Sequence, residues 1–246
     1  HCMRNKKWIS LAVAVVLTVT ALPATVFAAK DGESKEELTK VTLNEVAHSI
    51  FYAPQYAAIE LGCFEEEGID LKLVNGGGAD KVMTALISGD ADIGFMGSEA
   101  GIYVYQEGSE DYAVNFAQLT QRAGNFLVSR SPEPDFQWAD LKGKSVLGGR
   151  AGGMPEMVFE YILKKNGLDP QTDLSIDQSI SFGLTAAAFP GSGADYTVEF
   201  EPFATALEQQ GQGYVVASLG VDSGYVPYTA YSEPTWRSTR RSSRDL

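Results

Sequence analysis

The chain has 246 residues, 44% of them hydrophobic, so it can bury the core of one large domain or of two smaller lobes. Acidic residues outnumber basic ones by 32 to 19, and the formal net charge of −13 argues against nucleic acid as a partner, because phosphate binding needs clustered lysine and arginine. With two histidines and two cysteines in the whole chain, neither a metal site nor a cofactor is expected.

The N-terminal segment has the parts of an export signal. A basic region over residues 4–7 precedes an almost uniformly apolar run over 9–22, and small residues lead to a cleavage site after Ala28. A membrane anchor is the alternative, but the apolar run is shorter than the roughly 20 residues that span a bilayer. We therefore predict a signal peptide at 1–28, a flexible linker at 29–40, and an exported protein on the periplasmic or extracellular face of the bacterial membrane.

From residue 41 onward, short β-rich runs alternate with helical ones, as in a parallel sheet covered by helices. Pro54 fits the first position of a helix, and Gly62 and Gly89 mark two helix ends. Ser98 is expected to cap the third helix. Three βα units are therefore predicted in a first lobe, with strands at 41–46, 69–74 and 91–96 and helices at 54–61, 79–88 and 98–107.

Two closely spaced prolines within residues 131–135 make a stiff, non-helical connector after apolar runs at 113–119 and 125–129. We place the lobe boundary at this connector, which gives a first lobe at 41–130 and a second lobe at 131–226. The βα pattern then restarts. The predicted strands of the second lobe are at 141–147, 175–180, 196–200 and 214–218, and its predicted helices are at 155–165, 184–189 and 202–210.

In open parallel sheets, ligands bind beyond the carboxyl ends of the strands, where helix N-termini present unpaired N–H groups. Four strand-to-helix junctions meet this condition, at 47–52, 75–78, 97–99 and 148–153. The last has four glycines around Arg150, so it is either a cradle for an anionic group or a tight turn. It lacks the Gly-Lys-Ser/Thr ending and the Gly-x-Gly-x-x-Gly spacing of nucleotide-binding loops, so nucleotide hydrolysis is not expected.

Five side chains near these junctions have both a binding and a structural interpretation. Phe51 and Tyr52 could stack on a flat ligand or belong to the core. Glu99 could contact a ligand or complement the dipole of the helix that it begins. Glu199 and Glu201 could pair with a ligand amine or form a solvated pair at a helix entrance. The sequence has no Gly-x-Ser-x-Gly elbow and no triad spacing, so the residues give little support to catalysis.

Several motifs in this order resemble those of a known family. Residues 61–69 read LGCFEEEGI, residues 85–94 read ALISGDADIG, residues 140–146 read DLKGKSV, and residues 201–203 read EPF. Together they resemble the substrate-binding proteins of the sulfonate, nitrate and thiamine-pyrimidine importers, and the resemblance covers about residues 41–231. The joint order of the motifs is far more specific than any one of them.

The resemblance implies an α/β, two-lobed periplasmic-binding-protein-like fold of type II, in which each lobe is a mostly parallel sheet flanked by helices. Such a protein is the solute-binding component of an ABC importer: it closes on a small organic solute by a hinge movement and delivers it to a membrane permease. A monomer is expected. The family's pocket positions fall on Phe51, Tyr52, Ser98, Glu99, Gln121, Arg150, Gly152, Gly153, Glu199 and Glu201.

The solute class has two candidates. Aromatic side chains together with Glu99, Glu199 and Glu201 suit a flat, amine-bearing ligand such as an aminopyrimidine or another thiamine precursor, which we favour. Arg150 and the helix N-termini suit a sulfonate, nitrate or taurine. A thiamine-pyrimidine-synthase-like enzyme on the same fold is the alternative function, but the cysteine-rich motif of that enzyme is not found here, so we expect no enzyme.

The C-terminal segment departs from the family pattern. After residue 231 the family returns to its first lobe and adds further helices, whereas this chain ends soon after, with four arginines and no helical stripe over 236–246. The resemblance therefore implies a C-terminally truncated chain, in which 227–246 returns to the first lobe and ends in an aberrant or disordered basic tail.

Overall fold

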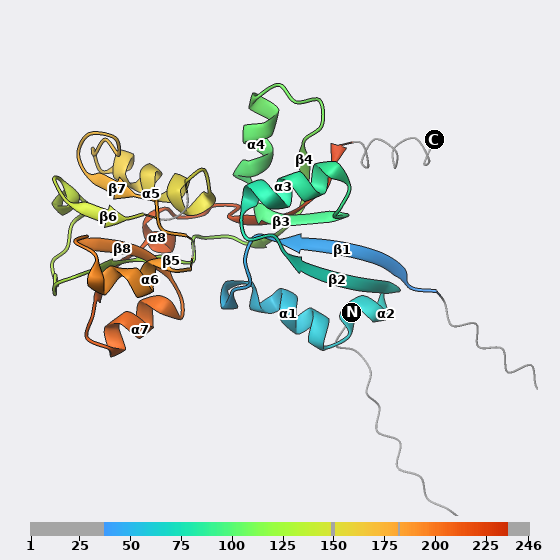
Figure 1. Cartoon of the computed structure of the whole chain (residues 1–246), viewed down its shortest axis with the longest axis horizontal. Helices are drawn as coiled ribbons and strands as arrows, with labels where there is room; N and C mark the ends of the chain where they lie inside the picture. Colours follow the sequence, from blue (N-terminus) through green and yellow to red (C-terminus); the bar gives the residue numbers. More distant parts are fainter. Residues whose placement is uncertain (1–36, 149–150, 182, 236–246) are drawn as a thin grey trace, which may run out of the picture.

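The computed structural model describes residues 37–148, 151–181 and 183–235. The predicted signal peptide, most of the predicted linker, Arg150 and the basic tail after residue 235 lie outside these residues. The described chain forms two α/β lobes side by side, each built on a five-stranded sheet (Figure 1). Among the described helices, none is long and apolar enough to cross a membrane.

The first lobe contains the sheet with strand order β2-β1-β3-β10-β4. β1 pairs in parallel with β2 and β3, and β10 runs antiparallel to both β3 and β4. The strands are β1 Thr39–Glu45, β2 Ile69–Asn75, β3 Ile93–Gly97, β4 Ala113–Thr120 and β10 Thr229–Pro234, and the helices are α1 Ala53–Glu60, α2 Cys63–Glu66, α3 Ala79–Ser88 and α4 Glu99–Gln106. A 3-10 turn, η1 Ile50–Tyr52, precedes α1.

The second lobe contains the sheet with strand order β7-β6-β8-β5-β9. β6 pairs in parallel with β7 and β8, and β5 pairs antiparallel with β8 and β9. The strands are β5 Asn125–Ser129, β6 Ser145–Leu147, β7 Ser175–Asp177, β8 Tyr196–Phe200 and β9 Tyr214–Ser218, and the helices are α5 Met154–Lys165, α6 Thr185–Ala188, α7 Phe203–Gln209 and α8 Leu219–Asp222. Two 3-10 turns, η2 Trp138–Leu141 and η3 Phe189–Gly191, complete this lobe.

The chain crosses between the lobes twice, from β4 to β5 and from α8 to β10 (Figure 1). The two crossing segments are hydrogen-bonded to each other: the Val226 N–H donates to the Gln121 carbonyl at 2.9 Å, and the Tyr228 N–H donates to the Thr120 carbonyl at 3.1 Å. Two adjacent crossings of this kind are the arrangement about which two lobes can rotate.

The position of the first crossing differs from the predicted lobe boundary. β5 belongs to the second sheet, because its whole length pairs with β8, so the crossing falls between Thr120 and Asn125 rather than at residue 131. The stiff connector at 131–135 is therefore inside the second lobe. β1 also begins at Thr39, inside the predicted linker, because Thr39 and Lys40 already pair with β2.

The hydrophobic pattern explains which predicted elements formed. In α3, Val82, Met83 and Leu86 are buried, as their three-and-four spacing predicts. β8, β9 and α3 have the bounds predicted from the sequence. The strand predicted at 141–147 is confirmed only from Ser145 onward, because η2 occupies its first residue and Gly143 turns the chain with a φ of 76°.

Candidate ligand-binding site

A cavity of about 290 Å³, here called the inner cavity, lies between the two lobes. From the first lobe it is lined by residues just after β1, β2 and β3, where the carboxyl ends of these strands meet. From the second lobe it is lined by the residues that lead into α5 and by Phe200 at the end of β8. Residues from all four predicted strand-to-helix junctions therefore line the inner cavity.

A wider cavity of about 800 Å³, here called the outer cavity, adjoins the inner one and shares Val46, Pro155 and Phe200 with it. Its lining includes Lys81 from α3 and Glu199 from β8. The two cavities form a continuous cleft with a mainly apolar inner part and a polar outer part, which is the pattern expected of a small-molecule site.

Glu99 is the first residue of α4 and lines the inner cavity. Its side chain is 1% exposed, and neither carboxylate oxygen has a hydrogen-bond partner within the described structure. Burial raises the pKa of Glu99 to about 7, although the peptide N–H groups of Glu99 and Met154 partly oppose this shift. These N–H groups approach the carboxylate without meeting hydrogen-bond geometry. A buried carboxylate without partners is costly, so this group is available to a ligand.

The return segment adds two further polar groups to the inner cavity. The Tyr228 hydroxyl and the Thr229 hydroxyl line it and, like Glu99, are buried without a hydrogen-bond partner in the described structure. The Tyr52 hydroxyl approaches Thr229 but forms no hydrogen bond of normal geometry with it. Burial, together with the nearby Tyr52 and Glu99, raises the pKa of Tyr228. Three side chains with unused hydrogen-bonding capacity therefore converge on one small space.

The charges around the inner cavity are acidic. Asp80 and Glu99 line it, and no lysine, arginine or histidine is found among its described lining residues. In the outer cavity, Glu199 is buried and accepts a hydrogen bond from the Thr197 hydroxyl at 2.6 Å, and burial raises the pKa of its carboxyl group. The carboxyl oxygens at the inner cavity can accept hydrogen bonds from N–H or O–H donors.

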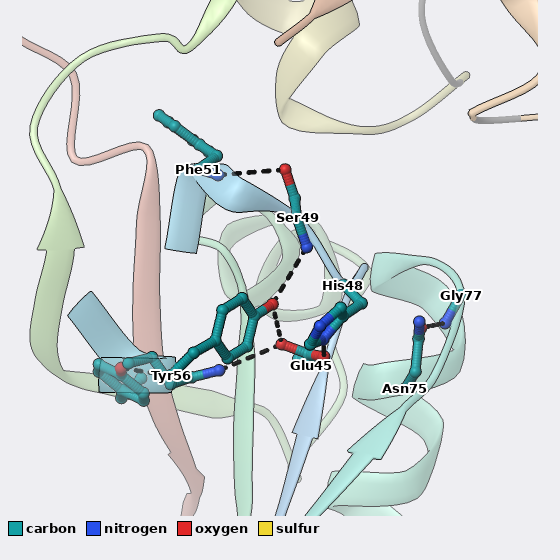
Figure 2. Close-up of polar contacts among 9 residues, drawn as sticks. Glu45, His48, Ser49, Phe51, Tyr56, Asn75 and Gly77 are labelled. Atoms are coloured by element: carbon teal, nitrogen blue, oxygen red, sulfur yellow. Dashed lines mark hydrogen bonds and ion pairs between the residues drawn. The ribbon is translucent and has the colours of Figure 1, made fainter. Parts of the chain in front are cut away.

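A buried glutamate, Glu45, holds the loop that lines both cavities (Figure 2). It ends β1 and accepts hydrogen bonds from the Tyr56 hydroxyl at 2.8 Å and from the Gln55 amide at 3.1 Å, while the His48 Nδ1 lies 3.0 Å from its other oxygen. The Ser49 N–H in turn donates to the Tyr56 hydroxyl at 3.1 Å. This network holds the segment between β1 and α1 in place.

The structure brings together only some of the predicted site residues. Tyr52, Glu99, Gly152 and Gly153 line the inner cavity, and Glu199 lines the outer one. Phe51 contacts neither cavity. Its ring packs on Tyr52, Phe200 and Tyr228 with centroid distances between 5.3 and 5.6 Å, so its structural interpretation is the one that the geometry supports.

Three other predicted residues do not line either cavity, and Arg150 lies outside the described residues. The Ser98 hydroxyl donates to the Pro227 carbonyl at 2.6 Å, which joins α4 to the return segment. Gln121 is exposed and takes part in the crossing through its backbone carbonyl. Glu201 accepts hydrogen bonds from the Thr205 N–H and hydroxyl at 3.1 and 2.9 Å, so it caps the start of α7.

Sequence reasoning missed several cavity residues, among them Met154, Asp80, Tyr228 and Thr229. Met154 and Asp80 follow glycine-rich junctions that the sequence did single out, so extending each junction by one or two residues would have found them. Tyr228 and Thr229 are far from those junctions and reach the cavity only because β10 pairs with β3. No local signal marks them. Among the described residues, no group of His, Cys, Asp and Glu side chains could hold a metal ion.

The two lobes and the cavity between them have the architecture of the periplasmic-binding-protein fold. The chain superposes on the periplasmic aliphatic sulphonate binding protein SsuA from Escherichia coli with a TM-score of 0.64, at 18% identity over 82% of this chain and 63% of that one. It superposes on the periplasmic nitrate-binding protein NrtA from Synechocystis PCC 6803 with a TM-score of 0.66, at 18% identity over 83% of this chain and 57% of that one. These similarities establish the fold.

Family membership follows from the sequence comparison. Residues 50–202 match the family described as NMT1/THI5 like, and since they make up more than half of the chain, the chain belongs to this family. It is also 46% identical over 225 residues to YtlA of Bacillus subtilis (strain 168), which is named as a binding protein. That match covers 92% of this chain and 66% of YtlA, so the chain spans about two thirds of the length of this relative.

Proposed function

We propose that this chain is the extracytoplasmic solute-binding component of a bacterial ABC importer. In this role it captures a small organic molecule between its two lobes and delivers it to a membrane permease. The observation that carries the proposal is the inner cavity, where Glu99, Tyr228 and Thr229 present unpartnered polar atoms between the lobes. Membership of the family, a relative named as a binding protein, and the sulphonate- and nitrate-binding neighbours support the same role.

The two crossings between the lobes support capture by closure. The cavity wall is divided between the lobes, so rotation about the crossings changes its volume and its access to water. The predicted signal peptide supports an exported protein, which acts as a monomer in this proposal. Binding is favoured over catalysis, because no described residue of the inner cavity pairs a nucleophile with a base, as a thiamine-pyrimidine-synthase-like or other enzyme would require.

A flat, amine-bearing solute such as an aminopyrimidine is the favoured class. The acidic Asp80 and Glu99 suit N–H donors, and the apolar faces of Met154 and Phe200 suit a flat ring. A sulfonate, nitrate or taurine is the second candidate, because Lys81 lines the outer cavity and α5 begins at the inner one.

A thermal-shift screen of the chain from residue 29 onward tests the proposal. The panel contains aminopyrimidines, thiamine, riboflavin, sulfonates, taurine and nitrate. A solute at about 100 times its dissociation constant should add about 2.7 kcal/mol to the free energy of unfolding. Stabilisation by an aminopyrimidine supports both the role and the favoured class, stabilisation by sulfonates supports the role with the second class, and a chain that responds to no solute contradicts the role.

A further inference from the structure

Phe51 lies behind the wall of the inner cavity and packs on three of the residues that form it. The centroid of its ring is 5.3 Å from that of Tyr52, 5.6 Å from that of Phe200 and 5.5 Å from that of Tyr228. All three of these residues line the inner cavity. Tyr52 belongs to the first lobe, Phe200 to the second, and Tyr228 to the second crossing between them. One ring therefore supports the cavity wall on both lobes and on the crossing.

The Phe51 ring also occupies the space beside Gly124, which lies in the crossing from β4 to β5. A Cβ atom at Gly124 would be only 2.3 to 2.8 Å from three carbon atoms of this ring, which is closer than van der Waals contact permits. The φ of Gly124 is not in the left-handed region, so its backbone would accept alanine. The ring, and not the backbone conformation, is therefore what requires glycine at this position.

The backbone of Phe51 is fixed to the first lobe (Figure 2). Its N–H donates to the Ser49 hydroxyl at 3.2 Å, and the Ser49 N–H donates to the Tyr56 hydroxyl, which is bonded to the buried Glu45. The ring points away from Glu45 and packs against the hydrophobic core of the second lobe as well as that of the first. Because the ring is held by one lobe and packed on the other, its size and position constrain the angle between them.

We infer that Phe51 is a positioning residue for solute binding: its ring, packed on Gly124, sets the angle between the two lobes. The backbone hydrogen bonds that join the two crossings at Thr120 and Gln121 lie just before Gly124 in the chain, so this contact is close to the axis of rotation. A small displacement near the axis becomes a larger one at the cavity. The inference rests on the proposed function, in which the lobes close on a solute, and adds to it the contact that fixes their angle.

The test measures the separation of the lobes by double electron–electron resonance between two nitroxide labels. The labels are attached through unnatural amino acids at position 84 on α3 and position 161 on α5, where Thr84 and Tyr161 are exposed on different lobes. The protein is measured without solute. Gly124→Ala is compared with the unsubstituted chain, and Gly191→Ala is the matched control, because a Cβ atom there meets nothing within 4 Å.

If Phe51 has this role, Gly124→Ala displaces the ring and shifts the mean distance between the labels, whereas Gly191→Ala leaves it unchanged. Adding Phe51→Leu to Gly124→Ala makes room for the methyl group, so the double variant returns the distance toward that of the unsubstituted chain. Phe51→Leu alone removes the ring contacts and broadens the distance distribution. This single variant decides the question if Gly124→Ala does not fold, since an unchanged distribution in Phe51→Leu would then overturn the inference.

Solute binding provides a second readout. Calorimetry with the solute of the panel that stabilises the unsubstituted chain should show binding weakened by about tenfold or more in Gly124→Ala, the scale of an overpacked contact. The double variant with Phe51→Leu should recover part of this loss. Gly124 and Phe51 do not line the inner cavity, so an effect on affinity has to pass through the position of the lobes or of the cavity wall.

Two results would overturn the inference and leave the importer role intact. The first is an unchanged label distance in Gly124→Ala together with a lower free energy of unfolding, which would show that Phe51 only fills the core. The second is a shift in Gly124→Ala that Phe51→Leu does not reverse, because the ring would then not be the group that the methyl displaces. If no solute of the panel binds, the proposed function fails, whereas a shift that Phe51→Leu reverses would still support the role of the contact in setting the angle.

Discussion

The Glu99 carboxylate occupies the space beside Gly97 that any larger side chain at position 97 would need. Gly97 ends β3 and Glu99 begins α4, so the two residues meet across a turn at the carboxyl end of a central strand. The absence of a side chain at residue 97 is what allows the carboxylate to lie in the inner cavity. This close approach makes Gly97 a sensitive position for binding.

Gly97→Ala is expected to displace the Glu99 carboxylate and to weaken solute binding by about tenfold or more. The methyl group has no other room, because the nearest atoms to it are those of the carboxylate. Calorimetry with the solute that stabilises the chain in the thermal-shift screen measures the effect. Gly193→Ala is the matched control, since a Cβ atom there meets nothing within 4 Å. Unchanged affinity in Gly97→Ala would contradict the arrangement described for Glu99.

The pH dependence of stability should differ between the unsubstituted chain and Glu99→Gln. Burial raises the pKa of Glu99 from 4.5 to about 7, so the folded state holds a proton that the unfolded state has lost. The favourable contribution is complete below pH 4.5 and is lost as the pH rises to about 7. The unsubstituted chain should therefore lose on the order of 3 kcal/mol relative to Glu99→Gln over this range.

Denaturant unfolding of both proteins at pH 5 and pH 8 measures this difference. Tyr52 and Tyr228 face the same cavity, but their raised pKa values lie far above the range used. Burial raises the pKa of Glu199 as well, and its effect is common to both proteins. Parallel stability profiles for the two proteins would show that Glu99 does not titrate in this window.

Arg130 holds four backbone carbonyls of the second lobe, and its replacement by lysine should be destabilising. Its guanidinium donates to the carbonyls of Phe189, Ser192 and Ala194 at 2.7 to 2.9 Å and to that of Pro190 at 3.4 Å, and it lies 4.6 Å above the Phe189 ring. A lysine ammonium group cannot reproduce the planar, forked arrangement of N–H donors of the guanidinium. Arg130→Lys should lower the free energy of unfolding by about 1–3 kcal/mol.

Arg122→Lys provides the comparison for this change, because Arg122 donates to one carbonyl, that of Gly220. Arg122→Lys should lower the free energy of unfolding by less than Arg130→Lys does when both are measured by urea unfolding. If the two substitutions lower the free energy of unfolding equally, the four-carbonyl contact of Arg130 contributes nothing beyond a single hydrogen bond.

Tyr196→Phe should destabilise the connector at 131–135. The Tyr196 hydroxyl contacts both oxygens of Glu133 at 2.8 and 2.9 Å, and the Ser129 hydroxyl donates to one of them at 2.6 Å. Removing the Tyr196 hydroxyl leaves Glu133 with only one of these two donors, the Ser129 hydroxyl. We expect a loss of about 1–2 kcal/mol in urea unfolding. Tyr161→Phe serves as the control because Tyr161 is 51% exposed, and an equal loss in both variants would show that Glu133 does not anchor Tyr196.

Local sequence patterns predicted most elements of the fold. The stripe in α3 and the apolar runs of β8 and β9 are properties of neighbouring residues, so the bounds of these elements could be obtained from the chain alone. The lobe boundary could not, because β5 has no sequence feature that distinguishes pairing with β8 from pairing with β4. Its place is decided by contacts with strands far away in the sequence.

The candidate site divides in the same way. The sequence by itself determined that Tyr52, Glu99 and Gly152 lie at strand-to-helix junctions, because glycines, helix starts and strand ends are local signals, and it predicted that a ligand binds there. Tertiary structure alone decided that the Ser98 hydroxyl donates to the Pro227 carbonyl, and that Tyr228 and Thr229 complete the cavity. The physical reason is that hydrogen-bond partners and cavity walls depend on strand pairing across more than a hundred residues, which no short segment records.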